Sequence, residues 1–148
     1  MSERVAMLSV EDAIETAKDV GIRESMAKVN AYRMLLNNPQ LARGVNELLT
    51  TLLFTNKTID VRLRELIIMR IGWVTGSCYE WTQHWRFAEA VGLPPEDVVG
   101  VRDWQNYDGY EAADRAVLAA VDDTLEHGKI TDAVWQECAA HVGGPAEL

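Results

Sequence analysis

The sequence predicts an all-α protein, a helical bundle that forms a single domain over residues 1–148. Three observations support this fold class. Apolar residues recur with the period of a helix along most of the chain, and the alternation typical of strands is nowhere sustained. A chain of 148 residues, 48% hydrophobic and 25% charged, has the size and composition of one globular core. The sequence contains no repeat, low-complexity segment or linker that would mark a second domain.

Start and stop signals define the helices of the first half. Ser9 can cap the first helix and Gly21 can end it. Pro39 opens the third, because proline is tolerated in a first helical turn. Asp60 is a suitable cap for the fourth, which Gly76 closes. The expected helices of this half cover residues 10–20, 23–36, 40–54 and 61–75.

The second half continues in the same way. A helix over residues 77–91 ends at Gly92, and the prolines at 94–95 start a short one. Residues 102–109 are expected to form a loop. A helix over residues 110–127 follows and ends at Gly128. Thr131 caps a last helix, which reaches residue 142. Residues 143–148 look like a connection followed by the start of another helix. We therefore expect a bundle that lacks its last helix.

Charge and cysteine content exclude several classes of protein. The net charge of −9 argues against nucleic-acid binding, which needs a basic surface. The longest apolar stretch, residues 66–74, contains Arg70 and is far too short to span a bilayer. The first residues do not form the pattern of a secretory signal, and two cysteines fit a reducing compartment. We expect a cytoplasmic protein that binds neither membrane nor nucleic acid.

Glu65 is the first candidate for chemistry, because its expected helix is apolar almost all round and helices of that kind are normally buried. Burial of a carboxylate is costly unless the group is paired or neutral. Two interpretations stay open. Glu65 forms a structural ion pair with Arg62, Arg70 or another arginine, or it is an acid used for proton transfer.

The next helix carries a denser set of polar groups. Ser77, Glu80, Trp81 and His84 fall on one face about 100° wide. Glu80 and His84 are four residues apart, so their side chains can touch. A hydroxyl, a carboxylate and an imidazole beside an indole are typical of a site in which Trp81 lines a pocket. The alternative, an exposed Glu–His contact on a solvated face, stays open.

Cys78 points about 100° away from Ser77 and so lies off that face. A small core residue is its simplest role, although an early helical position favours the reactive thiolate, which leaves a redox role open. A metal site is not expected. Helical di-metal sites combine two sets of ligands with Glu-x-x-His spacing, and the chain has a single Glu-x-x-x-His pair. No nucleotide-binding motif is present, so we expect no cofactor.

The order of these residues resembles the carboxymuconolactone decarboxylase family. Its alkylhydroperoxidase D branch carries a glutamate, eleven residues, Cys-x-x-Cys, three residues and a histidine. Here Glu65 lies twelve positions before Ser77, Glu80 three after Ser77, and His84 four after Glu80, so the spacing fits. The stretch 88–93 and the Pro-Glu-Asp that follows also fit. The resemblance covers roughly residues 25 to 142 and implies an all-helical fold.

The chain departs from the peroxidase branch at both cysteine positions, which Ser77 and Glu80 occupy. Without a resolving thiol the usual dithiol cycle cannot run. What remains resembles the decarboxylase branch, which keeps glutamate and histidine and needs neither metal nor organic cofactor. The resemblance therefore implies a lyase or isomerase that acts on a small carboxylated or carbonyl substrate. It also implies assembly as a trimer or hexamer.

In this first hypothesis His84 is the general acid or base and Glu80 orients it, while Glu65 is a second proton-transfer group. Because a turn at Gly76 folds the two helices against each other, we expect these three residues to converge on one pocket, with the imidazole within hydrogen-bond reach of a carboxylate. Ser77 donates a hydrogen bond to a developing oxyanion. An anionic substrate also needs a positive group, for which Arg62, Arg70 and Arg86 are the candidates.

Two other classes of function stay open. In one, Cys78 is the sole thiol of a peroxidase, and an external thiol or an intermolecular disulfide resolves its sulfenate. In the other, the chain is a non-catalytic oligomeric binding protein in which Glu65, Glu80 and His84 form a satisfied structural network.

Overall fold

The computed structural model describes residues 4–55 and 58–144. The residues it describes form helices and turns without a strand, which confirms the all-α class. The chain divides into two compact units, Met1–Asn56 and Lys57–Leu148, and each has its own apolar core. A single domain over residues 1–148 stays a prediction. Residues 145–148, on which the expectation of a missing last helix partly rests, lie outside the described residues.

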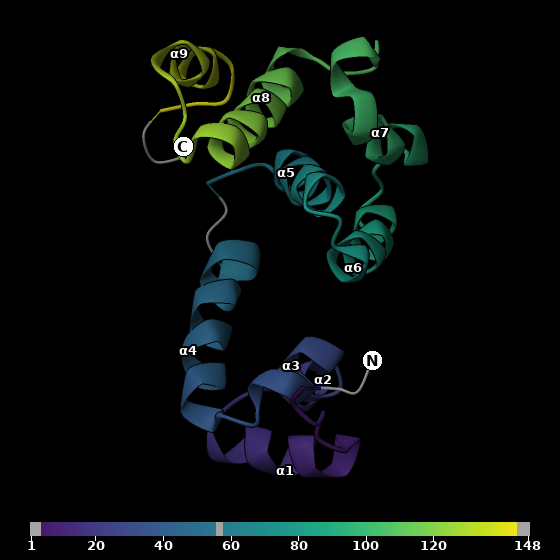
Figure 1. Ribbon diagram of the computed structural model, residues 1–148, viewed down its shortest axis with the longest axis vertical. Helices are drawn as coiled ribbons and strands as arrows, with labels where there is room; N and C mark the ends of the chain where they lie inside the picture. The colour runs from purple at the N-terminus through teal and green to yellow at the C-terminus, as the bar shows by residue number, and fades with distance from the viewer. Residues whose placement is uncertain (1–3, 56–57, 145–148) are drawn as a thin grey trace. The chain divides into compact units, whose positions relative to one another are not determined.

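The N-terminal unit is a set of short helices (Figure 1), and its small core consists of alanines with Ile22, Tyr32 and Leu36. The Ser9 hydroxyl caps the first helix by accepting from the Asp12 amide at 3.0 Å. Pro39 begins the helix that it was expected to open, which is the fourth in the structure because the second expected helix is divided. The described elements are α1 (Val10–Asp19), α2 (Glu24–Ala27), α3 (Asn30–Leu35), α4 (Pro39–Thr50) and the π-helical turn η1 (Thr51–Thr55).

Two expected helices of this unit have different limits. The helix expected over residues 23–36 is divided at Val29, whose ψ of 134° is extended, and the division leaves both Ala27 and Tyr32 in the core. The helix expected over 40–54 is α-helical only to Thr50. Beyond it the Thr55 hydroxyl donates to the Thr50 carbonyl at 3.4 Å, a side-chain bond of the kind that competes with regular helix.

The C-terminal unit is arranged around α5 (Val61–Val74), which packs against α6, α8 and η2. The side chains of Leu66, Met69, Val101 and Leu118 are fully buried in its core. The remaining elements are α6 (Cys78–Ala90), α7 (Pro95–Gly100), the 3-10 helix η2 (Val101–Asn106), α8 (Ala112–His127) and α9 (Asp132–His141) (Figure 1). Within the described ranges, no helix combines the length and the apolar character needed to cross a membrane.

The prediction of a loop over residues 102–109 was wrong for its first half, which forms the 3-10 helix η2. The helix expected from residue 110 begins instead at Ala112, because Glu111 and Asp114 form a capping box in which the Glu111 amide donates to Asp114 at 3.1 Å. The prediction that α5 is buried was also wrong for its last turn, where Trp73 is 45% exposed and Val74 is 47% exposed.

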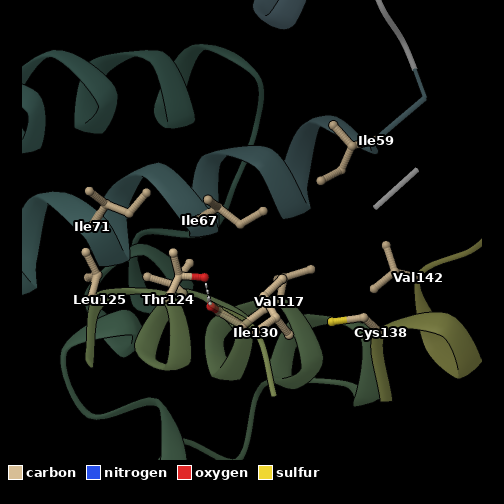
Figure 2. A pocket seen from close by; sticks show the side chains of 11 residues that line it. Ile59, Ile67, Ile71, Val117, Thr124, Leu125, Ile130, Cys138 and Val142 are labelled. Atoms are coloured by element: carbon tan, nitrogen blue, oxygen red, sulfur yellow. Dashed lines mark hydrogen bonds between the residues drawn. The ribbon is translucent and has the colours of Figure 1, made fainter. Parts of the chain in front are cut away.

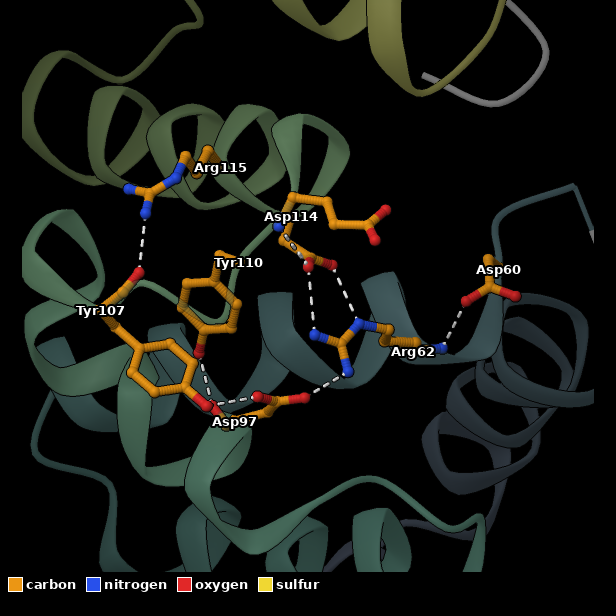
Figure 3. Close-up of polar contacts among 8 residues, drawn as sticks. Asp60, Arg62, Asp97, Tyr107, Tyr110, Asp114 and Arg115 are labelled. Atoms are coloured by element: carbon orange, nitrogen blue, oxygen red, sulfur yellow. Dashed lines mark hydrogen bonds and ion pairs between the residues drawn. The ribbon is translucent and has the colours of Figure 1, made fainter.

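A polar network joins α5 to α7 and α8 (Figure 3). The Arg62 guanidinium contacts Asp97 at 2.6 Å and both carboxylate oxygens of Asp114 at 3.1 Å. The Tyr107 hydroxyl donates to the Asp97 carboxylate at 2.6 Å, and the Tyr110 hydroxyl donates to the Asp97 carbonyl. Charge-assisted bidentate pairs of this kind fix the orientation of the elements that they join. The bond to Asp97 raises the pKa of Tyr107 to about 12, and burial raises the pKa of Tyr110.

Candidate active site

A helical hairpin brings the candidate residues together. Gly76 turns the chain between α5 and α6 with a φ of +68°, a conformation that glycine adopts without strain. Ser77 caps α6, since its hydroxyl oxygen accepts from the Glu80 amide at 3.4 Å. The two helices pack closely at Gly72, where a Cβ would make an ordinary contact with the Trp81 nitrogen at 3.4 Å and with the Glu80 Cβ at 3.6 Å. The face of α6 that carries Glu80 and Trp81 therefore lies against α5.

The central contact of the hairpin joins Glu65 of α5 to His84 of α6. His84 Nδ1 lies 2.7 Å from Glu65 Oε2. The Glu65 side chain is 0% exposed, whereas the His84 side chain is 18% exposed. The expectation that the imidazole lies within hydrogen-bond reach of a carboxylate is confirmed, whereas the convergence of Glu65, Glu80 and His84 on one pocket stays a prediction.

Glu65 has a second partner, which helical spacing does not indicate. Arg64 Nε donates to Glu65 Oε1 at 3.0 Å, so each carboxylate oxygen has a polar partner. The Arg64 side chain is 14% exposed and brings a compensating positive charge to the buried carboxylate. The structural interpretation of the burial of Glu65, an ion pair with an arginine, is therefore present, and its partner among the described residues is Arg64 rather than Arg62 or Arg70.

Glu80 stands on the other side of the imidazole. Its Oε2 lies 3.7 Å from His84 Nε2, too far for a hydrogen bond, and its side chain is 48% exposed. The strong contact of His84 is therefore with Glu65 and not with its neighbour on the same helix. This arrangement leaves Nε2 as the ring nitrogen without a close partner among the described residues.

Two of the arginines expected to receive an anionic substrate are held in structural contacts. Arg62 belongs to the network of Figure 3. Arg70 contacts Asp122 at 2.7 and 2.9 Å and donates to the Val101 carbonyl at 2.8 Å. Trp104 donates to the same Asp122 carboxylate at 2.9 Å. The third candidate, Arg86, is exposed on α6.

A cavity of about 360 Å³ opens at the N-terminal end of α6. His84 follows Trp81 by one helical turn and is not part of the wall. The cavity therefore lies next to the Glu65–His84 pair along α6 and does not include it. Its lining residues are Gly72, Trp73, Gly76, Ser77, Cys78, Trp81, Thr82 and Arg102.

A second cavity, of about 230 Å³, lies among α5, α8 and α9 (Figure 2). Ile67 and Ile71 of α5 face Val117 of α8 across it, and no carboxylate or imidazole of the described residues lines it. Cys138 closes one side, where its thiol donates to the Ala116 carbonyl at 3.4 Å and burial raises its pKa. This cavity is apolar and offers no group for proton transfer.

Residues whose partners lie far away in the chain gave no signal in the sequence. Arg102 lies in the segment expected as a loop, yet its guanidinium lies over the rings of both Trp73 and Trp81, in cation–π contact. Asp97, Tyr107 and their partner Arg62 form no local pattern, because Arg62 reaches Asp97 across 35 residues. Within residues 4–55 and 58–144 no group of three or more His, Cys, Asp or Glu side chains is arranged to hold a metal ion.

Comparison with known proteins gives one relationship. The family model for the carboxymuconolactone decarboxylase family matches residues 39–123, which include α5, α6 and the hairpin between them. Searches of curated proteins and of solved structures gave no match.

Proposed function

Since the chain belongs to the carboxymuconolactone decarboxylase family, we propose that it is a cofactor-independent lyase or isomerase in which His84 transfers the proton. The observation that carries this proposal is the 2.7 Å contact between His84 Nδ1 and the fully buried Glu65 carboxylate. A buried carboxylate that accepts from one ring nitrogen fixes the tautomer and the orientation of the imidazole. The other nitrogen is then a base of defined direction.

The proposed roles differ in one respect from those expected from helical spacing. Glu65 is the positioning residue that accepts Nδ1–H, and Arg64 balances its charge. Nε2 of His84 is the atom that gives or takes the proton. Glu80, half exposed and 3.7 Å from Nε2, exchanges that proton with solvent.

A decarboxylation at this site begins at the bond between the substrate carbon and its carboxylate. That bond breaks, CO₂ leaves, and the electron pair stays on the carbon as a carbanion or enolate. Nε2–H of the imidazolium then delivers a proton to the carbon, and His84 regains a proton from solvent by way of Glu80. Ser77 supports this step, because its oxygen accepts from the Glu80 amide and its hydroxyl hydrogen remains able to donate to the enolate oxygen.

The test is solvent exchange at carbon, which can be followed whatever the product is. Small carboxylates and ketones are incubated with the protein in D₂O, and proton NMR follows deuterium incorporation and loss of CO₂. His84→Gln should slow the reaction by roughly 10²–10⁴-fold. His127→Gln, at an exposed position in the last turn of α8, is the matched control and should leave the rate unchanged. Equal rates in wild type and His84→Gln would exclude His84 as the proton-transfer group.

A second candidate function has its own supporting observation. The Cys78 thiol is exposed, and Cys78 is the first residue of α6 and lines the cavity of about 360 Å³. A thiolate there would attack a hydroperoxide, release the alcohol and become a sulfenate, which an external thiol must reduce because Cys138 is buried on α9. Repeated turnover of a hydroperoxide that Cys78→Ser abolishes would favour this function. Failure of both activities would favour a non-catalytic binding protein.

We also propose a homotrimer or homohexamer, on the strength of the family relationship. Light scattering on the purified protein tests it, and a particle of monomer mass, 16.6 kDa, would refute it. A cytoplasmic location is proposed because Cys78 and Cys138 are both free thiols, as a reducing compartment favours.

A further inference from the structure

We propose that the cavity at the N-terminal end of α6 binds a flat organic anion, an aromatic or conjugated monocarboxylate, through Arg102 and the indoles of Trp73 and Trp81. As a substrate-binding site it rests on the proposed function, whereas binding of the anion can be measured independently of catalysis.

Arg102 lies over the rings of two indoles. Its Cζ atom is 4.8 Å from the ring centroid of Trp73 and 4.7 Å from that of Trp81. The two indoles are themselves 5.8 Å apart and tilted by 57°. A guanidinium held by cation–π contacts uses its charge and not its N–H groups, so these donors stay available to an acceptor. The two contacts therefore position a cation without using up its hydrogen bonds.

The charge of Arg102 has no carboxylate partner in the described part of the chain. Within residues 4–55 and 58–144 its guanidinium makes neither an ion pair nor a hydrogen bond, in contrast to Arg62 and Arg70. Its neighbour Asp103 instead accepts from the Asn106 amide at 2.9 and 3.1 Å. In a protein of net charge −9, an arginine that is ordered beside a cavity and left without an acid is suited to a ligand's negative charge.

The cavity fits a small planar molecule. Its volume of about 360 Å³ lies in the range of small-ligand sites. Trp73, which is 45% exposed, offers an aromatic face against which a flat ring can stack. Ser77 and Thr82 supply hydroxyls, and the N-terminal end of the 13-residue α6 favours negative charge.

The number of charged side chains that line the cavity indicates how many carboxylates its ligand carries. Among the lining residues that the structure describes, Arg102 is the only charged side chain. A guanidinium pairs with a carboxylate through two parallel hydrogen bonds, so one carboxylate is matched. A second carboxylate on the ligand would lack a counter-charge in the cavity.

Benzoate is the probe for the binding test, and the indole N–H signals in a proton–nitrogen NMR spectrum are the readout. Benzoate should shift the signals of Trp73 and Trp81 and leave that of Trp135, on α9, unchanged. Benzamide, of similar shape but neutral, should bind at least tenfold more weakly, and cyclohexanecarboxylate, charged but not flat, should also bind more weakly. Equal affinity for benzoate and benzamide would contradict a role for the charge.

Variants test the residue itself. Arg102→Gln should weaken benzoate binding by tenfold or more, and Arg102→Lys should be intermediate because it keeps the charge and loses the planar fork. Lys129→Gln removes the same unit of charge at an exposed position between α8 and α9 and should leave the affinity unchanged. Unchanged affinity in Arg102→Gln, or no shift of either indole in the millimolar range, would overturn the proposal. His84→Gln should retain benzoate binding, so a failure of catalysis is distinguished from a failure of this site.

Discussion

Replacement of Glu65 by glutamine should lower the free energy of unfolding of the C-terminal unit by about 1.5–3 kcal/mol. Arg64 Nε donates to one carboxylate oxygen at 3.0 Å, and His84 Nδ1 lies 2.7 Å from the other. Glutamine has the same shape, but it is uncharged and has a single acceptor oxygen. When that oxygen faces Arg64, the NH₂ group faces Nδ1 and can bond to it only after the imidazole proton has moved to Nε2. Because Glu65 is 0% exposed, water cannot replace the charge-assisted bonding that is lost. The cost is that of one charge-assisted hydrogen bond.

Tryptophan fluorescence during urea unfolding is the assay. All five tryptophans lie in the C-terminal unit, at positions 73, 81, 85, 104 and 135, so their emission reports on that unit alone. Glu80→Gln is the matched control. It makes the same change at a carboxylate that is 48% exposed and 3.7 Å from the imidazole, and we expect an effect below about 0.5 kcal/mol. If the two variants unfold at the same urea concentration, the buried contact does not have the strength assigned to it.

Variants of the C-terminal unit also test the polar network of Figure 3 and the packing at two glycines. Asp97→Asn should bring the pKa of Tyr107 down from about 12 towards 10, as measured by ultraviolet absorbance; an unchanged titration would exclude the Asp97 hydrogen bond as the cause. Because that pKa is raised in the folded state, wild type should lose stability as the pH rises from about 10 to about 12, and a flat profile there would contradict the linkage. Gly100→Ala should cost about 1–3 kcal/mol, since its Cβ would lie 2.7 and 2.9 Å from ring atoms of Tyr107. Gly72→Ala, with its nearest contact at 3.4 Å, should stay within about 1 kcal/mol of wild type, and equal effects of the two glycine variants would refute the steric argument.

Local spacing is enough to predict the hairpin and the meeting of Glu65 with His84. A turn at Gly76 fixes which turns of the two helices face each other, so residues on either side of it can be paired by counting. The same counting predicts that Glu80 orients His84, because four residues separate them. The structure has Glu65 at 2.7 Å and Glu80 at 3.7 Å, since a buried carboxylate on the facing helix competes with an exposed one on the same helix.

Contacts between distant parts of the chain cannot be predicted in this way. Arg62 and Arg70 lie near Glu65 in the sequence, yet each contacts an aspartate 52 residues further on. Nothing in a single sequence indicates which of many acids an arginine will reach. The stacking of Arg102 depends likewise on how η2 packs against α5, which no periodicity encodes.

The central claim is that Glu65 holds the Nδ1 proton of His84 and leaves Nε2 to transfer the proton. Determination of the His84 tautomer tests this claim most directly. Long-range proton–nitrogen NMR distinguishes the two neutral forms of an imidazole, and the exposed His127 and His141 provide internal references. At a pH where the ring is neutral, we predict that wild-type His84 carries its proton on Nδ1, held by Glu65, and that Glu65→Gln shifts the proton to Nε2. A wild-type His84 with its proton on Nε2, or one whose tautomer does not respond to Glu65→Gln, would contradict the account.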